Sequence, residues 1–174
     1  MSVDKGMSES ARMATAAEAR FRINAPNSRP RNIKVIALDA PSETLVKHLA
    51  EGPWRHASFF TASSFAAAPP GQGFSMKGWL SDLAGRTKDL LDEVASADLV
   101  VMVATAGENA QAAALIGEAC SLKRINTTGL ILGGAAATDE MLSKTLSRLR
   151  PWSLMLVIAN GEDYVEDMLI ALRA

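Results

Sequence analysis

Polar residues in two short turns have the types and spacing to orient a small ligand. Ser42 lies in the turn "DAPSE", while Thr105, Gly107 and Asn109 lie in the turn "TAGEN". Hydroxyl, amide and backbone N–H groups of this kind fix small molecules in crevices. They would make the chain a small-ligand sensor or an enzyme, with residues 63–78 as a lid over the crevice.

The sequence lacks the common motifs for phosphate binding, acyl transfer and metal binding. Dinucleotide-binding turns use glycines that let the backbone approach a pyrophosphate, whereas the first turn has Ala40 and Pro41. No Walker lysine follows a glycine loop, and no serine lies in a G-x-S-x-G context. His48 and His56 have no cysteine or histidine at ligand spacing. We therefore expect no cofactor and no metal, and a role without catalysis is favoured.

Acidic residues recur where the helices are expected to begin. Four of them are candidate partner-binding residues: Asp39, Glu108, Glu162 and Asp163. Acids in a first helical turn also complement the helix dipole, by about 0.3–1 kcal/mol each, so the pattern has a purely structural interpretation as well. Its functional interpretation is an acidic edge that attracts a basic protein segment or a divalent cation.

The stretch from residue 63 to residue 78 is a long connection rich in proline and glycine. Connections of this length in compact domains are typically lids or binding loops. Four apolar residues would anchor a partner there: Phe65, Phe74, Met76 and the nearby Trp79. A loop packed on its own protein is the alternative interpretation.

The elements that must position these residues alternate along the chain. Short β-branched runs and longer helical stretches follow one another from residue 33, as in a parallel sheet covered on both faces. Strands are predicted at 33–39, 57–62, 98–105, 127–133 and 153–160. The fold class is therefore α/β: a three-layer α/β/α sandwich with a mostly parallel five-stranded sheet of Rossmann-like or flavodoxin-like order.

Strand order decides where a ligand would lie. The run 98–105 is apolar on both faces, which places it at the sheet centre. Ligands bind outside the carboxyl ends where strand order reverses, so the crevice is expected between "DAPSE" and "TAGEN". Ser42 is predicted to cap the helix after the first turn. Further helices are predicted over 79–94 and 108–123.

Four stretches follow the order of a helix, an "AD" strand, a turn, an alanine-rich helix and later a strand ending in asparagine. They read "WLSDLAGRTKDLLDEVASADLVVMVATAG", "AAALIGEAC", "TTGLILG" and "LMLVIANGED". Over about residues 33–170 this order resembles the core of the tubulin-like GTPases, in particular FtsZ. The family's phosphate loop is a glycine run, whereas residues 106–112 hold one glycine, Gly107. The resemblance therefore implies a degenerate FtsZ-like domain without GTP binding.

Composition and charge indicate the number of domains and the compartment of the cell. The chain has 174 residues, is 48% apolar and carries a net charge of −1, which fits one α/β domain over residues 32–174. The single cysteine, Cys120, is expected to be a buried thiol in a reducing compartment. Apolar runs are too short for a membrane span or a secretory signal. The sequence therefore predicts a cytoplasmic protein that does not enter the membrane.

Residues 1–31 differ in composition from the rest. They carry six basic and three acidic residues, a balance of +3 that leaves −4 for the remainder, and are rich in serine, alanine and arginine. Such a segment is predicted to be a disordered basic tail. It lacks the interleaved aromatic residues of nucleic-acid binders, and the body is acidic, so a nucleic-acid partner is disfavoured.

Together these features favour a non-catalytic protein-binding module with a regulatory, accessory or assembly role. Its partner would be another protein, reached through a basic segment. The small-ligand sensor or enzyme is the alternative, and a homo-oligomer is left open.

Overall fold

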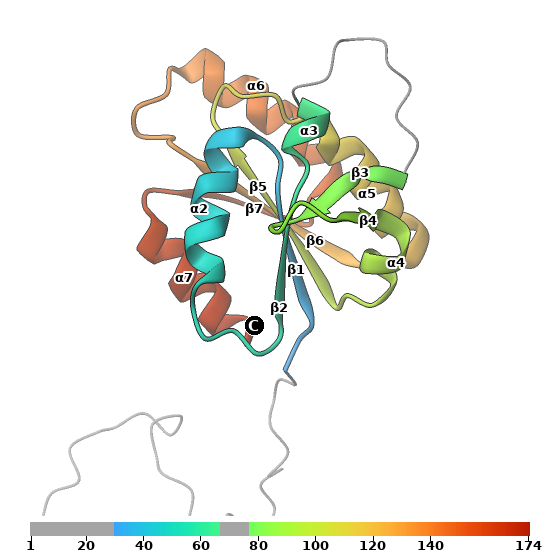
Figure 1. Ribbon diagram of the computed structural model, residues 1–174. Helices are drawn as coiled ribbons and strands as arrows, with labels where there is room; N and C mark the ends of the chain where they lie inside the picture. The colour runs from blue at the N-terminus through green and yellow to red at the C-terminus, as the bar shows by residue number, and fades with distance from the viewer. Residues whose placement is uncertain (1–29, 67–76) are drawn as a thin grey trace, which may run out of the picture.

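The computed structural model describes residues 30–66 and 77–174. Its centre is a seven-stranded sheet of order β4-β3-β2-β1-β5-β6-β7 (Figure 1). The strands are β1 (Ile33–Ala37), β2 (Ala57–Thr61), β3 (Lys77–Asp82), β4 (Thr87–Asp89), β5 (Leu99–Thr105), β6 (Asn126–Leu132) and β7 (Met155–Ala159). Strands β2, β1, β5, β6 and β7 pair in parallel, whereas β3 and β4 are antiparallel. The predicted α/β class, with a mostly parallel sheet and its central strand, is confirmed.

Helices cover both faces of this sheet. The helices are α2 (Ala40–Ala50), α3 (Ser63–Ala66), α4 (Leu90–Ala95), α5 (Ala112–Lys123), α6 (Asp139–Leu149), the 3-10 turn η2 (Arg150–Trp152) and α7 (Glu162–Ala171). Helices α2 and α7 share one hydrophobic cluster with the sheet, and α4, α5 and α6 share the other. Within residues 30–66 and 77–174, no helix has the length and apolar character of a membrane span.

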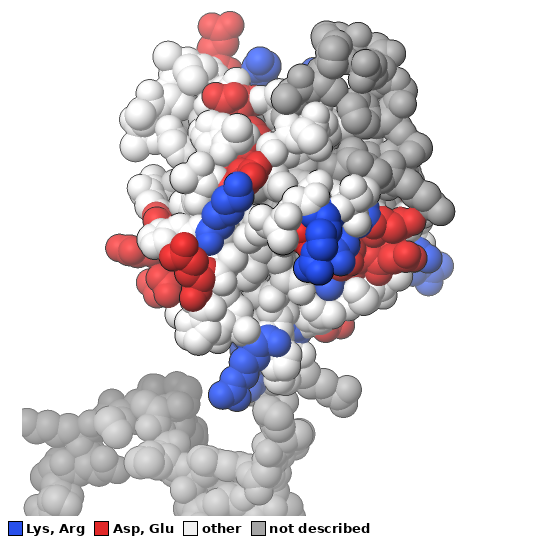
Figure 2. Space-filling view, in the orientation of Figure 1, with Lys and Arg blue, Asp and Glu red and all other residues white. Residues whose placement is uncertain are grey.

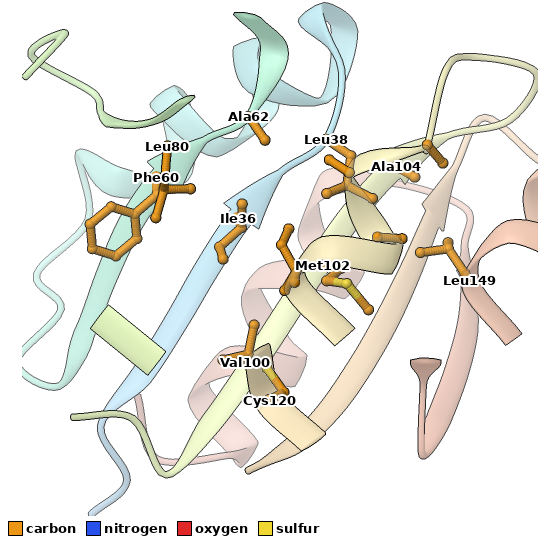
Figure 3. Close-up of a cluster of buried hydrophobic side chains, with 14 of the residues drawn as sticks. Ile36, Leu38, Phe60, Ala62, Leu80, Val100, Met102, Ala104, Cys120 and Leu149 are labelled. Carbon is orange, nitrogen blue, oxygen red and sulfur yellow. The ribbon is translucent and has the colours of Figure 1, made fainter. Parts of the chain in front are cut away.

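Strand β5 alternates between the two clusters. Val101 and Val103 pack with α2 and α7, while Val100 and Met102 face α5. Figure 3 shows Val100 and Met102 beside Cys120, which α5 carries into the same cluster. A strand buried on both faces needs apolar side chains throughout, which explains its uninterrupted apolar sequence.

The thiol of Cys120 is buried, and this burial raises its pKa to about 12. We expect native protein at pH 8 to react with a thiol reagent at least about a hundredfold more slowly than protein unfolded in urea. The unfolded thiol titrates near its ordinary value while the native thiol keeps its proton. Stability should therefore fall above about pH 9, by up to about 1.4 kcal/mol per pH unit from this group. Rapid labelling without denaturant would contradict the burial.

The helix predicted over 79–94 is wrong. The chain forms the β3–β4 hairpin there, and helix is confined to Leu90–Ala95. The side chain of Asp82 accepts hydrogen bonds from the N–H groups of Ala84 and Arg86, and Gly85 has a φ of +82°. This tight turn prevents a continuous helix over these residues. Leu80 and Leu90 still reach the same hydrophobic core, Leu80 from strand β3 and Leu90 from helix α4. The sheet accordingly has seven strands, two more than predicted.

Two helix starts also differ from expectation. Asp39 caps α2, and Ser42 is the third helical residue in a reciprocal capping box. Helix α5 begins at Ala112, four residues later than predicted. The side chain of Asn109 accepts a hydrogen bond from the N–H of Gln111 and so holds the preceding residues in a turn.

Candidate functional site

Strand order reverses between β1 and β5, as the sequence predicts. Strand β2 lies on one side of β1 and β5 on the other, so the turns after β1 and β5 are neighbours at the carboxyl edge. In open α/β sheets this is the position where ligands bind. The hydrogen bonds of the side chains in these two turns show whether they are free to bind a small ligand or hold the two turns together.

The carboxylate of Asp39 joins the two turns. It is only 2% exposed. Its Oδ2 accepts a 2.8 Å hydrogen bond from the N–H of Thr105, and its Oδ1 accepts from the Thr105 hydroxyl at 3.0 Å and from the Ser42 N–H at 2.8 Å. The Ser42 hydroxyl donates to the carbonyl of Asp39. Ser42 and Thr105, two of the residues expected to orient a ligand, therefore bond to Asp39 instead.

The turn after β5 is held against α6. The N–H of Gly107 donates to Thr145 Oγ1 at 2.9 Å. Gly107 has a φ of +87°, and a Cβ there would lie 2.6 Å from the Met141 side chain. The N–H group that could have approached a phosphate already bonds to Thr145, and the positive φ disfavours any residue other than glycine at this position.

The predicted acidic edge is divided among separate places. Asp39 is buried in the junction just described. Glu108 lines a hollow of about 230 Å³ with Lys144 and Arg148 of α6, so basic residues lie beside it. Glu162 and Asp163 lie in the first turn of α7. Only these last two share one surface.

Another acidic residue, Glu43, bonds to residues at the end of β2. Its carboxylate accepts hydrogen bonds from Thr61 and Ser63 and forms an ion pair with Lys47, 2.6 Å away. Burial raises the pKa of Glu43, but the hydrogen bonds from Lys47, Ser63 and Thr61 outweigh it, so the pKa lies below its ordinary value. Glu43 is thus charged at neutral pH and occupied with its own protein.

A groove between α2 and α7, which we call the α2–α7 groove, was not predicted. One hollow, of about 240 Å³, is lined by His48, Glu51, Glu162 and Glu166 among others. An adjoining hollow, of about 200 Å³, shares Glu166 and adds further lining residues: Pro53, Trp54, Ile170 and Ala174.

Charge gathers at this groove. Figure 2 shows acidic side chains collected over α7. His48 Nδ1 contacts the Glu162 carboxylate across the groove, which ties α2 to α7. The available sequence signal was the spacing of acids along α7, where Glu162 and Glu166 are four residues apart and lie directly beside the stripe of the buried Val165 and Leu169.

The apolar anchors predicted for residues 63–78 are distributed differently. Phe65 lies in the short helix α3 and packs, half-buried, against the core. Trp79 lies in β3, and Phe74 and Met76 lie outside the described residues, as do residues 1–29 of the predicted tail. Among the residues that the structure describes, no group of three or more His, Cys, Asp or Glu side chains is placed to hold a metal ion.

Comparisons with known proteins give a limited result. No protein-family model and no curated protein matches the chain. Similar solved structures include translation elongation factor SelB from Methanococcus maripaludis in its apo form, at 16% identity and a TM-score of 0.47 over 82% of this chain. SelB in complex with a GTP analogue gives 11% identity and a TM-score of 0.46 over 85%. The chain spans about a third of SelB, 33% and 34%, and the likeness stops at the general α/β architecture.

Proposed function

We propose that the protein is a non-catalytic binding module, of regulatory, accessory or assembly type, that receives a basic segment of another protein in the α2–α7 groove. The observation that carries this proposal is the grouping of three carboxylates, from Glu51, Glu162 and Glu166, beside the apolar Trp54 and Ile170. Carboxylates steer a basic segment and fix its register, while a neighbouring apolar pocket accepts one anchoring side chain.

The state of the crevice supports binding of a protein over binding of a small molecule. A ligand between the turns would have to displace hydrogen bonds of Asp39 with Thr105 and Ser42. Leaving such buried groups unpaired costs about 1–3 kcal/mol each. The alternative of a ligand sensor or enzyme using Ser42, Thr105, Gly107 and Asn109 would need to recover that cost.

A titration with a short fluorescein-labelled peptide that alternates arginine and leucine tests the groove. We expect binding that weakens about tenfold in the double variant Glu51→Lys/Glu166→Lys, because each lost attraction becomes a repulsion. The matched control is Glu118→Lys/Glu140→Lys, which changes net charge equally at exposed positions of α5 and α6.

Equal weakening in both double variants would mean that the peptide responds to overall charge, and the groove would lose its role. If the control binds as the unmodified protein does, the groove is the site. The same pair of variants then serves as bait in extracts of the native cells, where a partner lost with the groove variant alone would name the pathway.

We further propose that the domain is a degenerate relative of the FtsZ and tubulin fold. This is supported by the four stretches of similar sequence and by the single glycine left in the turn after β5. We expect saturating GTP with Mg²⁺ to change the melting temperature by less than about 1 °C, because the Gly107 N–H already bonds to Thr145. A rise of several degrees with GTP, or with any nucleotide or acyl metabolite of a panel, would favour the crevice instead.

A further inference from the structure

The α2–α7 groove places an apolar hollow beside carboxylates. The hollow of about 200 Å³ is lined by Pro53, Trp54 and Ile170 among others, and Ile170 is 59% exposed. Glu166 lines both this hollow and the adjoining one, and none of the described lining residues is a lysine or an arginine. A segment that fits this surface therefore needs basic and apolar side chains close together.

The chain itself contains such a segment. Residues 20–23 read "RFRI", so two arginines alternate with the large apolar residues Phe21 and Ile23. The next acidic residue after them is Asp39, sixteen residues beyond Ile23. This stretch, which we call the RFRI segment, has both kinds of side chain that the groove would bind.

The described part of the chain begins beside this groove. The N–H of Arg31 bonds to the carbonyl of Arg173, which follows α7, and the next residue, Ala174, lines the apolar hollow. Figure 1 shows the C-terminus near the first residues of β1. Residues 1–29 therefore join the domain at one end of the groove.

The connection is long enough for the RFRI segment to reach any part of the groove. Phe21 lies nine residues before Pro30, and nine extended residues span up to about 30 Å. Helix α7 has ten residues and is therefore about 15 Å long. A tethered segment also has an effective concentration on the order of millimolar, so a weak attraction is enough to fill the groove.

We propose that the RFRI segment binds in the α2–α7 groove of its own chain and competes there with the basic segment of another protein. Its apolar residues supply the anchor for the hollow, and its arginines pair with the carboxylates of Glu51 and Glu166. This inference rests on the proposed function, because it concerns the regulation of the same groove. A partner must displace the segment, so its apparent affinity falls with the fraction of molecules whose groove is open.

Paramagnetic broadening in the full-length protein measures this contact directly. A nitroxide on Asn24→Cys follows the RFRI segment by one residue, and it does not attach to Cys120, which is buried with a pKa raised to about 12. We expect the indole N–H signal of Trp54 to lose most of its intensity, while that of Trp152, in the hydrophobic cluster on the other face of the sheet, keeps it. Equal broadening of both signals, or of neither, would overturn the contact.

A charge swap shows whether the arginines and the carboxylates meet. The broadening of Trp54 should be lost in Arg20→Glu/Arg22→Glu and restored when Glu51→Lys/Glu166→Lys is added. Restoration requires that both pairs of residues belong to one contact. Broadening that survives Arg20→Glu/Arg22→Glu, or a swap that folds by circular dichroism yet restores nothing, would contradict the proposed pairing.

Mixed samples separate binding within one chain from binding between two copies. Protein that carries the nitroxide but no isotope is mixed with isotope-labelled protein that carries no nitroxide, so broadening of Trp54 can come only from another molecule. We expect none. Broadening in the mixture as strong as in the doubly labelled chain would place the segment on a second copy and overturn binding in its own groove.

The fluorescein-labelled peptide of the groove titration tests the competition. We expect Arg20→Glu/Arg22→Glu to bind the peptide at least about threefold more tightly than the unmodified protein, because the groove is open in more molecules. Arg12→Glu/Arg29→Glu is the matched control, since it changes the charge equally on either side of the RFRI segment. Equal tightening in both variants would be a response to charge alone and would overturn the competition. Absence of peptide binding in every variant would overturn the proposed function, whereas the broadening of Trp54 decides the internal contact.

Discussion

Replacing Asp39 by alanine is expected to lower the free energy of unfolding by about 1.5–5 kcal/mol. The change removes the N-cap of α2, which costs about 0.5–2 kcal/mol. It also removes the acceptor of the Thr105 N–H, and a buried donor left without a partner costs about 1–3 kcal/mol. Urea denaturation monitored by circular dichroism measures the sum.

The matched control is Thr138→Ala at the N-cap of α6. The Thr138 side chain also accepts a backbone hydrogen bond, from Met141, but is exposed. Its loss should cost about 1 kcal/mol. If Asp39→Ala destabilises the protein no more than Thr138→Ala does, the hydrogen bonds between Asp39 and Thr105 contribute nothing to stability. Asp39→Asn should fall between the two, because the amide can cap α2 but its NH₂ group cannot accept from Thr105.

The parallel framework could be predicted because its strands are buried on both faces. Strand β5 is the clearest case: residues that alternate between two hydrophobic clusters must all be apolar, so the run itself indicates a central strand. The switch point between β1 and β5 followed from that position. Burial of Cys120 on a helix facing the sheet is likewise confirmed.

The hairpin at β3 and β4 was missed because spacing cannot distinguish two routes to the same core. Leu80 and Leu90 are both fully buried, as a helix would require, but a turn centred on Gly85 separates them. The stretch "SDLAGR" contained the signal, since aspartate followed by a glycine with left-handed geometry favours a tight turn. Local turn chemistry outweighed the periodicity of the leucines.

The sequence predicted where the candidate site lies in the fold, but not which side chains contact one another there. Asp39 and Thr105 are 66 residues apart, and nothing in their spacing shows that the Asp39 carboxylate accepts two hydrogen bonds from Thr105. The α2–α7 groove likewise joins residues near 50 with residues near 166. Contacts between distant segments depend on how the helices pack, which hydrophobic patterning leaves open.

Gly117→Ala in α5 is expected to destabilise the protein by about 1–3 kcal/mol, against the usual preference of helices for alanine. Alanine normally gains about 1 kcal/mol over glycine inside a helix. Here a Cβ would lie 2.5 Å from the Cβ of Trp152 and 2.6 Å from its ring. Overpacking of this kind costs more than the propensity gains.

Trp152 cannot easily move away, because its carbonyl accepts a hydrogen bond from the Thr127 hydroxyl. The matched control is Ala114→Gly, at an exposed position of the same helix, which should cost about 1 kcal/mol from propensity alone. Thermal and urea unfolding measure both changes, and a stabilised Gly117→Ala variant would contradict the close approach.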